Sequence, residues 1–425
     1  MRIAIIAAGS RGDVQPPAGL AAALAACGHE PRLVAPPEFA SLAAPGVDFV
    51  PLPIDIRAEL ASGPSSAMFE RGGNPLVFIR HFVELSRRLA LDMTIACRDA
   101  TKDCDVVVGT GLSVYAAACV AEYWKVPCVH AFLQPMIASR DFPSPVAPVP
   151  SFRMPGWMNR MQHKALAGAI WFPMRFIANS VVRKTLALPP SPLALPIEVA
   201  AARGESVAMA YSRHLLPRGS EWPANVVVTG FWFLDAPRDW APPRDLQRFL
   251  DEGEPPVYVG FGSMGMKDPR ATLDAALGAI ATARCRAVIG TGWGGLRDDN
   301  LPAHVFAIDE APHDWLFPRM AAVVHHGGAG TTGAALRAGK PSVVVPFLLD
   351  QFFWGARLKD IGVAPPPIPH RKLTAAKLGA ALKDVLANDA MRARAEKIGE
   401  AVRLEDGLGH AIAMIESAAT APLPR

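Results

Sequence analysis

Cysteine is scarce in this chain, and its cysteines are not paired at short spacing. The 425 residues include six cysteines, and no two of them form the C-x-x-C pair that is typical of redox motifs. Most of them lie in apolar segments, as small core residues do. We therefore expect reduced thiols without a disulfide framework, which favours a cytoplasmic protein.

Long hydrophobic runs are also missing. Hydrophobic residues make up 51% of the chain, yet no stretch reaches the roughly 18 uninterrupted apolar residues of a membrane span. The start, MRIAIIAAGS, has one arginine and an apolar run too short for a signal peptide, so it predicts a first strand. Both observations favour a soluble globular protein that remains inside the cell.

The chain has no strong excess of either charge. Its net charge is +4, and the basic residues are scattered rather than gathered in the runs that nucleic-acid partners usually require. We therefore expect no nucleic-acid partner. The length and the apolar content suffice for two domains, each with its own core.

Apolar runs of strand length alternate with helical stretches rich in Ala and Leu. This alternation predicts an α/β protein with two parallel sheets and helices on both faces of each. The first series has strands at 3–8, 32–35, 105–109 and 126–131, and helices at 19–27 and 114–124. The second series has strands at 226–229, 256–262, 287–291, 305–308, 322–325 and 342–346, a helix at 271–283 and a last helical stretch at 390–418.

Residues 325–332 read HHGGAGTT directly after an apolar run. This wording predicts a strand that ends in a tight turn and opens a helix, whose N-terminal N–H groups bind phosphate without a metal ion. His326 can add a donor or a positive charge to a departing diphosphate, and Thr331 can add a hydroxyl. Neighbouring side chains on a strand point to opposite faces, so His325 and His326 predict no metal site, and His325 is expected to be structural.

Asp350 and Gln351 follow the next apolar strand and a short turn, 24 positions past His326. A carboxylate beside an amide suits bidentate hydrogen bonds to neighbouring sugar hydroxyls. Two consecutive strand ends would thus hold two parts of one nucleotide sugar, the diphosphate and the sugar.

The spacing of these motifs resembles a known signature. From His326 through Gly339-Lys340-Pro341 and Pro346 to Asp350-Gln351, it is similar to the donor signature of the UDP-glycosyltransferase superfamily. HHGGAGTT and the N-terminal AGSRGDVQP (residues 8–16) resemble its bacterial antibiotic and sterol glycosyltransferase branch. The resemblance implies two doubly wound Rossmann-like domains facing across a cleft, the GT-B fold. It also implies a nucleotide sugar as substrate, with no cofactor and no metal ion.

The resemblance also assigns the parts of the chain. Residues 1–234 would form an N-terminal acceptor-binding domain, and the Pro-rich, charged segment 235–245 an exposed linker. Residues 246–395 would form a C-terminal nucleotide-sugar-binding domain. Residues 396–425 would form a C-terminal helix, which in the family returns to the N-terminal domain.

Asp13 is the candidate catalytic base. It follows the first predicted strand on a loop with Gly9 and Gly12, where other branches of the superfamily have histidine and the antibiotic branch has aspartate. A carboxylate can accept the proton late, once bonding to the anomeric carbon has acidified the acceptor hydroxyl. The alternative is that Asp13 only caps a helix beginning near residue 15.

Further donor contacts are implied by the positions that match the family. The diphosphate would be bound by Ser263, His326, Gly327, Gly328, Gly330 and Thr331, the sugar by Asp350 and Gln351, and the nucleotide by Ser10, Arg11, Trp293, Ala311 and His313. The segment around Ala311 lacks the Trp-Ala-Pro-Gln wording of the plant enzymes, so UDP and dTDP both stay open.

Residues 142–197 contain no Asp or Glu but six Lys or Arg, among many aromatic residues and methionines. In the family this region forms a variable acceptor wall, so we assign the wall to Trp157, Met161, Trp171, Phe172 and Phe176 and expect a lipophilic acceptor. Two alternatives are an ordinary helix pair that packs its apolar face inward and a basic amphipathic surface that makes peripheral contact with a membrane.

These observations together predict an inverting transferase. It would move a hexose, glucose first, from a UDP- or dTDP-sugar to a hydroxyl of a polyketide or macrolide, a sterol, a phenolic or another natural product. Alternatives are glycosylation of a lipid or membrane-associated acceptor, a sugar-nucleotide epimerase and a non-catalytic sugar-nucleotide-binding partner protein. A nicotinamide enzyme is disfavoured, because the segment from Gly9 to Asp13 lacks the third glycine of G-x-G-x-x-G.

Overall fold

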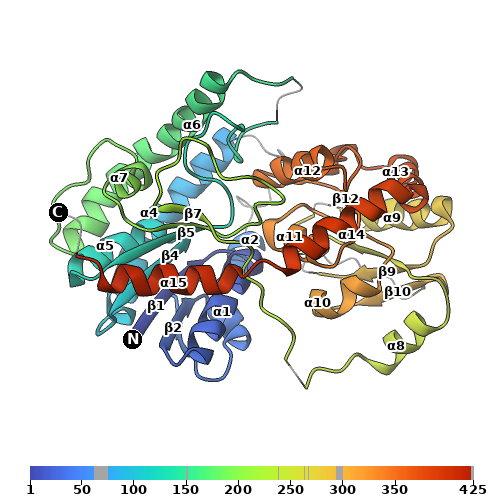
Figure 1. The fold of residues 1–425 in the computed structure, drawn as a ribbon, viewed down its shortest axis with the longest axis horizontal. Coiled ribbons are helices and arrows are strands. Elements are labelled where there is room, and N and C mark those ends of the chain that lie inside the picture. The colour runs from blue at the N-terminus through green and yellow to red at the C-terminus, as the bar shows by residue number, and fades with distance from the viewer. Residues whose placement is uncertain are drawn as a thin grey trace. The chain divides into compact units, whose positions relative to one another are not determined.

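The fold was analysed in a computed structural model, shown in Figure 1. The structure describes residues 1–61, 75–149, 152–237, 239–262, 264–266, 268–292 and 300–422. They divide into two compact units. Unit 1 comprises the described residues up to Leu234 together with those from Asp406 onward, and unit 2 comprises Asp235–Glu405.

Unit 1 is built on a seven-stranded parallel sheet in the order β3-β2-β1-β4-β5-β6-β7. In the central strand β1, residues 3–7 are fully buried, because helices cover both faces of the sheet. Ile3 lies opposite Pro31 on one side and Val106 on the other. The strands are β1 (Arg2–Ala8), β2 (Glu30–Ala35), β3 (Asp48–Pro51), β4 (Val106–Gly111), β5 (Cys128–Phe132), β6 (Val207–Met209) and β7 (Val226–Val228).

The C-terminal helix packs within unit 1, where it contacts α1, β4 and β5 (Figure 1). The His29 ring lies 3.1 Å from the Glu416 carboxylate, and His410 lies 3.0 Å from the Thr229 carbonyl. The helices of unit 1 are α1 (Arg11–Ala26), η1 (Pro37–Leu42), α2 (Ile56–Ala61), α4 (Pro75–Ala100), α5 (Val114–Trp124), α6 (Gly156–Ile177), the π-helical η2 (Ala178–Arg183), α7 (Pro196–Ala202) and α15 (Gly407–Thr420).

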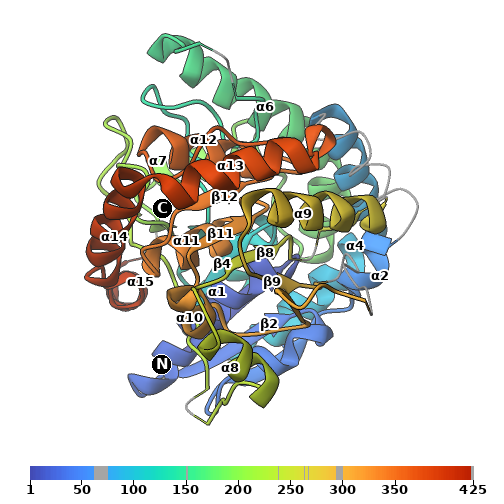
Figure 2. The same ribbon diagram turned by 90° about the vertical axis from the view of Figure 1, so that its right-hand side faces the viewer.

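Unit 2 has a five-stranded parallel sheet in the order β10-β9-β8-β11-β12. Its core lies on both faces of this sheet, with α9 and α13 side by side on one face (Figure 2) and α10, η3 and α11 on the other. The strands are β8 (Val257–Gly260), β9 (Ala287–Gly290), β10 (Val305–Ile308), β11 (Ala322–His325) and β12 (Ser342–Val344). The helices are α8 (Arg244–Asp251), α9 (Pro269–Ala283), α10 (His313–Leu316), η3 (Phe317–Arg319), α11 (Ala329–Arg337), α12 (Asp350–Asp360), η4 (His370–Lys372), α13 (Ala375–Ala387) and α14 (Asp389–Arg403).

The α/β class and the two parallel sheets are thus confirmed, with three corrections. The strand expected at 226–229 to open the second series is β7, at the edge of the first sheet beside β6. The first helix begins at Arg11 rather than near residue 15, so Asp13 lies in its first turn. The helical stretch at 390–418 is two helices, because Asp406 caps a new helix by accepting the Gly409 N–H at 2.8 Å.

One helix of the described chain, Gly156–Arg183, is long and apolar enough to cross a membrane by length and composition alone. The sequence analysis did not identify this segment as a membrane span, because Arg175 interrupts its apolar residues. Only 22% of the apolar window is buried, so this segment is not an ordinary core helix.

Candidate functional site

Asp13 is held at the junction of β1 and α1 in unit 1. Its Oδ2 accepts the backbone N–H of Ser10 at 2.8 Å and the Ser10 hydroxyl at 3.0 Å. Gly9, with φ +136°, makes room for this carboxylate, since a Cβ there would lie 2.4 Å from Oδ2. Asp13 therefore does not cap a helix that begins near residue 15. It is the third residue of α1, and it accepts the N–H of the N-cap residue Ser10 through one of its two carboxylate oxygens.

The surroundings of Asp13 make its carboxylate a stronger base than an exposed one. Burial raises its pKa above the ordinary value, and the two hydrogen bonds from Ser10 oppose part of that rise. A base with a raised pKa has a greater driving force for taking a proton from a hydroxyl.

Ser10 and Arg11, which were predicted to contact the nucleotide, are engaged within α1. The Ser10 hydroxyl is directed to Asp13, and Arg11 Nε donates to Gln15 Oε1 at 3.1 Å. The nucleotide role of these two residues stays a prediction.

In unit 2, His325 ends β11 and is fully buried. Its Nδ1 accepts the Gly327 N–H at 3.1 Å, which fixes the geometry of the turn. Burial, with a smaller effect of His326 and His313, lowers the pKa of His325 to about 3. His325 is therefore a neutral structural group, as the sequence indicated.

His326 begins the turn after β11. Burial lowers its pKa to about 4, so the imidazole is neutral at pH 7 in this structure. A positive charge on His326 beside a bound diphosphate stays a prediction. Gly262 and Gly328 make room for this ring, since a Cβ at Gly328 would lie 2.4 Å from its Nε2. His326 Nδ1 is buried without a hydrogen-bond partner in the described part of the chain, so the ring can act as a neutral donor or acceptor.

Gly327 and Gly328 form the tight turn that opens α11. Gly327 has φ +90°, and a Cβ there would lie 2.8 Å from the Gln351 carbonyl oxygen and from Val344 Cγ1. Gly328 is the N-cap of α11, so the first N–H groups of that helix lack intrahelical acceptors. Gly330 and Thr331 lie in this first turn, and a Cβ at Gly330 would meet no atom within 4 Å.

Asp350 and Gln351 begin α12 after a turn in which Leu349 has φ +48°. The Gln351 side chain is only 4% exposed. Its Oε1 accepts the N–H groups of Phe347 at 2.8 Å and Leu348 at 3.2 Å, and its Nε2 lies 3.1 Å from the Met264 sulfur. In this conformation Gln351 fixes the turn, and Asp350, which is partly exposed, is the member of the pair at the surface.

The two motifs meet in unit 2. Strands β11 and β12 are neighbours in the sheet, with His325 opposite Val344, and the turn at Gly327 packs directly on the Gln351 backbone. The predicted phosphate-binding and sugar-binding segments therefore lie side by side. Two further residues, which the sequence analysis did not select, lie beside these segments: Gly262 beside His326, and Met264 beside Gln351. Their signal in the sequence was their place in the G-F-G-S-M motif around Ser263.

The other residues predicted to bind the donor are not shown to lie beside these two segments. Ser263 and Trp293 lie outside the described residues. The His313 ring stacks on Phe317 with centroids 4.2 Å apart, and Ala311 packs against the same apolar cluster. The structure gives no separate support for their nucleotide role.

The predicted acceptor wall is divided by the structure. Trp171 is buried and packs on the Tyr115 ring at 5.2 Å, whereas Trp157, Met161, Phe172 and Phe176 are exposed. The five side chains therefore do not form one continuous wall within unit 1.

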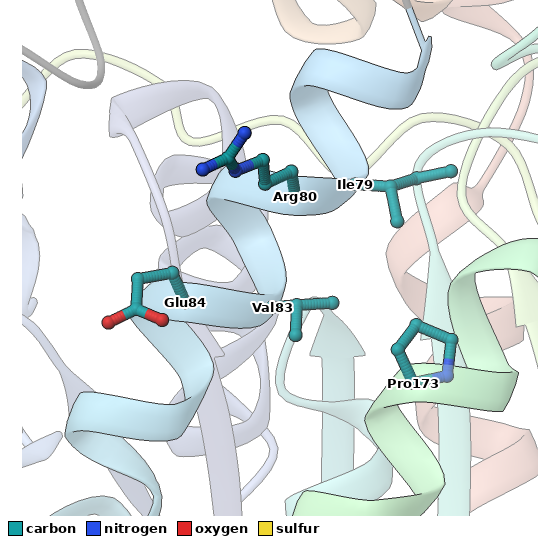
Figure 3. A pocket seen from close by; sticks show the side chains of 5 residues that line it. All are labelled: Ile79, Arg80, Val83, Glu84 and Pro173. Carbon is teal, nitrogen blue, oxygen red and sulfur yellow. The ribbon is translucent and has the colours of Figure 1, made fainter.

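An open pocket of about 410 Å³ lies between α4 and α6 (Figure 3). Ile79 and Val83 of α4 point toward Pro173 of α6, while Arg80 and Glu84 extend from the other side of α4. This hollow is small and mostly apolar. No group of three or more His, Cys, Asp or Glu side chains that could hold a metal ion is found among the residues that the structure describes.

Comparison with known proteins places these motifs in a family. The family "Erythromycin biosynthesis protein CIII-like, C-terminal domain" matches residues 294–405. Sterol 3-beta-glucosyltransferase UGT80B1 of Arabidopsis thaliana is 32% identical over 425 residues, covering 97% of this chain and 67% of the relative. A sterol 3-beta-glucosyltransferase of Aspergillus fumigatus is 32% identical over 428 residues, covering 98% of this chain but only 30% of the relative.

Solved structures show the same fold. The glycotransferase of kitacinnamycin aligns with a TM-score of 0.70 at 18% identity, covering 98% of both chains. CalG4, the calicheamicin glycosyltransferase, aligns with a TM-score of 0.66 at 21% identity, covering 98% of this chain and 97% of the other. With its two parallel-sheet units and its similarity to these relatives over nearly its whole length, the chain belongs to the UDP-glycosyltransferase superfamily, and it is a glycosyltransferase with the GT-B fold.

Proposed function

We propose that this enzyme is an inverting glycosyltransferase that moves a hexose, glucose first, from a UDP- or dTDP-sugar to a hydroxyl of a lipophilic small molecule. The observation that carries the proposal is the adjacency of the HHGGAGTT turn and the Asp350-Gln351 turn at the ends of β11 and β12. The names of the relatives, sterol 3-beta-glucosyltransferases, support glucose as the sugar and a sterol-like hydroxyl as the acceptor.

The proposed reaction is one displacement. The acceptor oxygen bonds to the anomeric carbon of an α-linked donor while the bond from that carbon to the diphosphate oxygen breaks, and the product linkage is β. The hydroxyl proton passes to Asp13. The departing diphosphate keeps the electron pair and is stabilised by the N-terminal N–H groups of α11 and by neutral His326. The proposal involves no cofactor and no metal ion.

The support for a lipophilic acceptor comes from the names of the sterol 3-beta-glucosyltransferase relatives, because the open pocket between α4 and α6 is lined by Arg80 and Glu84 as well as by apolar side chains. Sterols, polyketides or macrolides, and phenolics are the acceptor classes proposed. We propose a cytoplasmic enzyme, in accord with its six free cysteines. A lipid-borne acceptor is the second candidate, favoured by the exposed apolar side chains of α6.

The first test is a thermal-shift panel with UDP, UDP-glucose, dTDP, dTDP-glucose and NAD. A ligand at about 100 times its dissociation constant adds ~2.7 kcal/mol of stability. We expect stabilisation by UDP or dTDP compounds, which would also identify the nucleotide, and a smaller shift for His326→Ala. Stabilisation by NAD alone would contradict the proposal.

A second experiment separates an enzyme from a binding protein. The donor that stabilises the fold is incubated with a sterol, a macrolide and a phenolic, and products are detected by mass spectrometry. A hexosylated product is expected from at least one acceptor. Donor binding with no transfer to any acceptor class, and no hydrolysis of the donor, would favour the non-catalytic alternative.

A further inference from the structure

Helix α6 presents its apolar side to solvent. Trp157, Met161, Phe172 and Phe176 are 60%, 60%, 64% and 71% exposed, and we call these four side chains the α6 stripe. Ala165 and Ala169, at successive four-residue steps between Met161 and Phe172, are also exposed. Residues three and four positions apart lie on one side of a helix, so the stripe is continuous along α6.

The opposite side of α6 is anchored to protein through polar residues. Asn159 and His163 are buried, and Asn159 Nδ2 donates to the Arg140 carbonyl at 2.9 Å. The His163 ring lies 3.2 Å from the Phe142 carbonyl, and Trp171 packs on Tyr115. The N-terminal half of α6 therefore turns polar side chains inward and its C-terminal half buries Trp171 and Ile177, and these inner contacts fix the helix with the stripe outward.

Positive charges accompany the stripe. Arg160 is paired with Glu221 at 3.3 Å, and Arg183 is paired with Glu122 at 2.8 Å. Exposed Lys164, Lys184 and Arg153 have no carboxylate partner within the described part of the chain. Because residues 142–197 contain no acid, these cations are not offset by neighbours in the same segment.

We propose that the α6 stripe docks on an anionic lipid surface, with α6 lying in the plane of the membrane interface. Bulky aromatic and methionine side chains would enter the acyl boundary, and the cations would contact lipid phosphates. Figures 1 and 2 show α6 at the periphery of unit 1. The inference does not depend on the sugar-transfer proposal.

The positive charges beside the α6 stripe distinguish among the partners that could cover it. A second copy of this chain docked stripe to stripe would bring Lys164 and its neighbours against the same cations, which is unfavourable. If α6 crossed the bilayer, Asn159, His163 and the protein groups that they contact would lie in the hydrocarbon core. The helix α6 therefore cannot span the membrane while it keeps those contacts. An anionic interface satisfies both the apolar stripe and the cations.

The test is flotation of the full chain with phosphatidylcholine vesicles and with vesicles that also contain phosphatidylglycerol. We expect co-flotation with the anionic vesicles and its weakening by salt. Lys164→Gln should weaken partitioning about fivefold, which corresponds to ~1 kcal/mol. The double variant Trp157→Ser, Phe172→Ser should weaken it at least about a hundredfold, since each buried aromatic side chain contributes on the order of tenfold or more.

Leu404→Ser is the matched control, because Leu404 is 87% exposed but belongs to unit 2 and is not part of the α6 stripe. It should float as the unchanged chain does, and circular dichroism would verify that all variants fold. Absence of flotation for the unchanged chain, or flotation that the α6 variants leave intact, would overturn the proposal. So would a dimer in solution that the double variant dissociates, because a second copy would then occupy the stripe.

Discussion

The Ser10 hydroxyl and the Asp13 carboxylate are joined across the first turn of α1, with 3.0 Å between Ser10 Oγ and Asp13 Oδ2. The Ser10 N–H donates to the same oxygen, so Oδ2 accepts both bonds. Asp13 Oδ1 has no hydrogen-bond partner among the described residues and faces Gly111. The bonds from Ser10 therefore leave one Asp13 oxygen available for the proton transfer that we propose.

Asp13→Asn should abolish most transfer while keeping the fold. The amide oxygen of Asn can still accept the bonds from Ser10, but the amide cannot take a proton from the acceptor. We expect kcat to fall at least about 10²-fold, with donor affinity nearly unchanged, because the donor motifs lie in unit 2. Turnover and UDP-sugar titration would measure the two effects.

Loss of a helix cap elsewhere provides the control. Asn388 caps α14 by accepting the Met391 N–H at 3.0 Å, so Asn388→Ala should cost about 1 kcal/mol of stability without lowering kcat. Near-normal transfer by Asp13→Asn would show that Asp13 is not the base.

The raised pKa of Asp13 also predicts a stability effect. A carboxyl whose folded pKa lies above its unfolded pKa contributes stability that is fully present below the unfolded pKa and is lost as pH rises through the folded pKa. At neutral pH the buried charge therefore destabilises the fold, and Asp13→Asn should have the higher Tm. The difference should vanish near the ordinary aspartate pKa of 3.8. A lower Tm for Asp13→Asn at neutral pH would contradict this account.

The strands that carry the donor motifs could be predicted from the sequence. The expected strand at 322–325 coincides with β11, and the one expected at 342–346 contains β12 at 342–344, because strands buried on both faces are unbroken apolar runs. The three-residue strand β7 was placed in the wrong sheet, because its pairing with β6 is a long-range contact that chain order does not reveal.

Side-chain directions could not be predicted in the same way. Trp171 is buried against Tyr115 of α5, whereas its neighbour Phe172 is exposed, and the residue types alone do not show which of the two side chains points inward. The inward turn of Gln351 depends on the N–H groups of Phe347 and Leu348, which have no strand partner. The residue types therefore indicated which segments form the candidate site, whereas tertiary packing determines which of their side chains are exposed to a ligand.

Buried histidines should make the fold acid-sensitive. Burial lowers the pKa of His326 and of His163 to about 4, and that of His325 to about 3. A group with a lowered folded pKa contributes stability that is present above the unfolded pKa of 6.5 and is lost as pH falls through the folded pKa. Tm should therefore drop as pH falls from 6.5 toward 4.

His326→Gln should flatten part of this decline, because one buried imidazole no longer resists protonation. Calorimetry of the variant and of exposed His304→Gln across this pH range would measure the change. An equal flattening by His304→Gln would mean that burial of His326 is not the cause.

Two glycines of the HHGGAGTT turn should respond differently to the same substitution. Gly327→Ala combines φ +90° with a Cβ 2.8 Å from the Gln351 carbonyl oxygen, so it should destabilise unit 2 by more than about 1 kcal/mol. Gly330→Ala places its methyl in open space within α11 and should stabilise the helix by about 0.5–1 kcal/mol. If the donor phosphates bind this turn, Gly330→Ala should still weaken UDP binding, which calorimetric titration would detect. If Gly330→Ala leaves the UDP affinity unchanged, the donor phosphates do not bind at this part of the turn.

Asp350 and Gln351 should also separate into a ligand-binding and a structural residue. Gln351→Leu leaves the buried N–H groups of Phe347 and Leu348 without an acceptor, so it should cost roughly 1–3 kcal/mol of stability. Gln351→Glu keeps an acceptor at Oε1 and should lose less stability.

Asp350→Asn keeps the shape of the side chain but removes its charge, so donor affinity should fall more than stability. The measurements are chemical denaturation for stability and titration with the nucleotide sugar and with the nucleotide alone. If Asp350 contacts the sugar, Asp350→Asn should weaken binding of the nucleotide sugar more than binding of the free nucleotide. Equal weakening of both would mean that other residues bind the sugar.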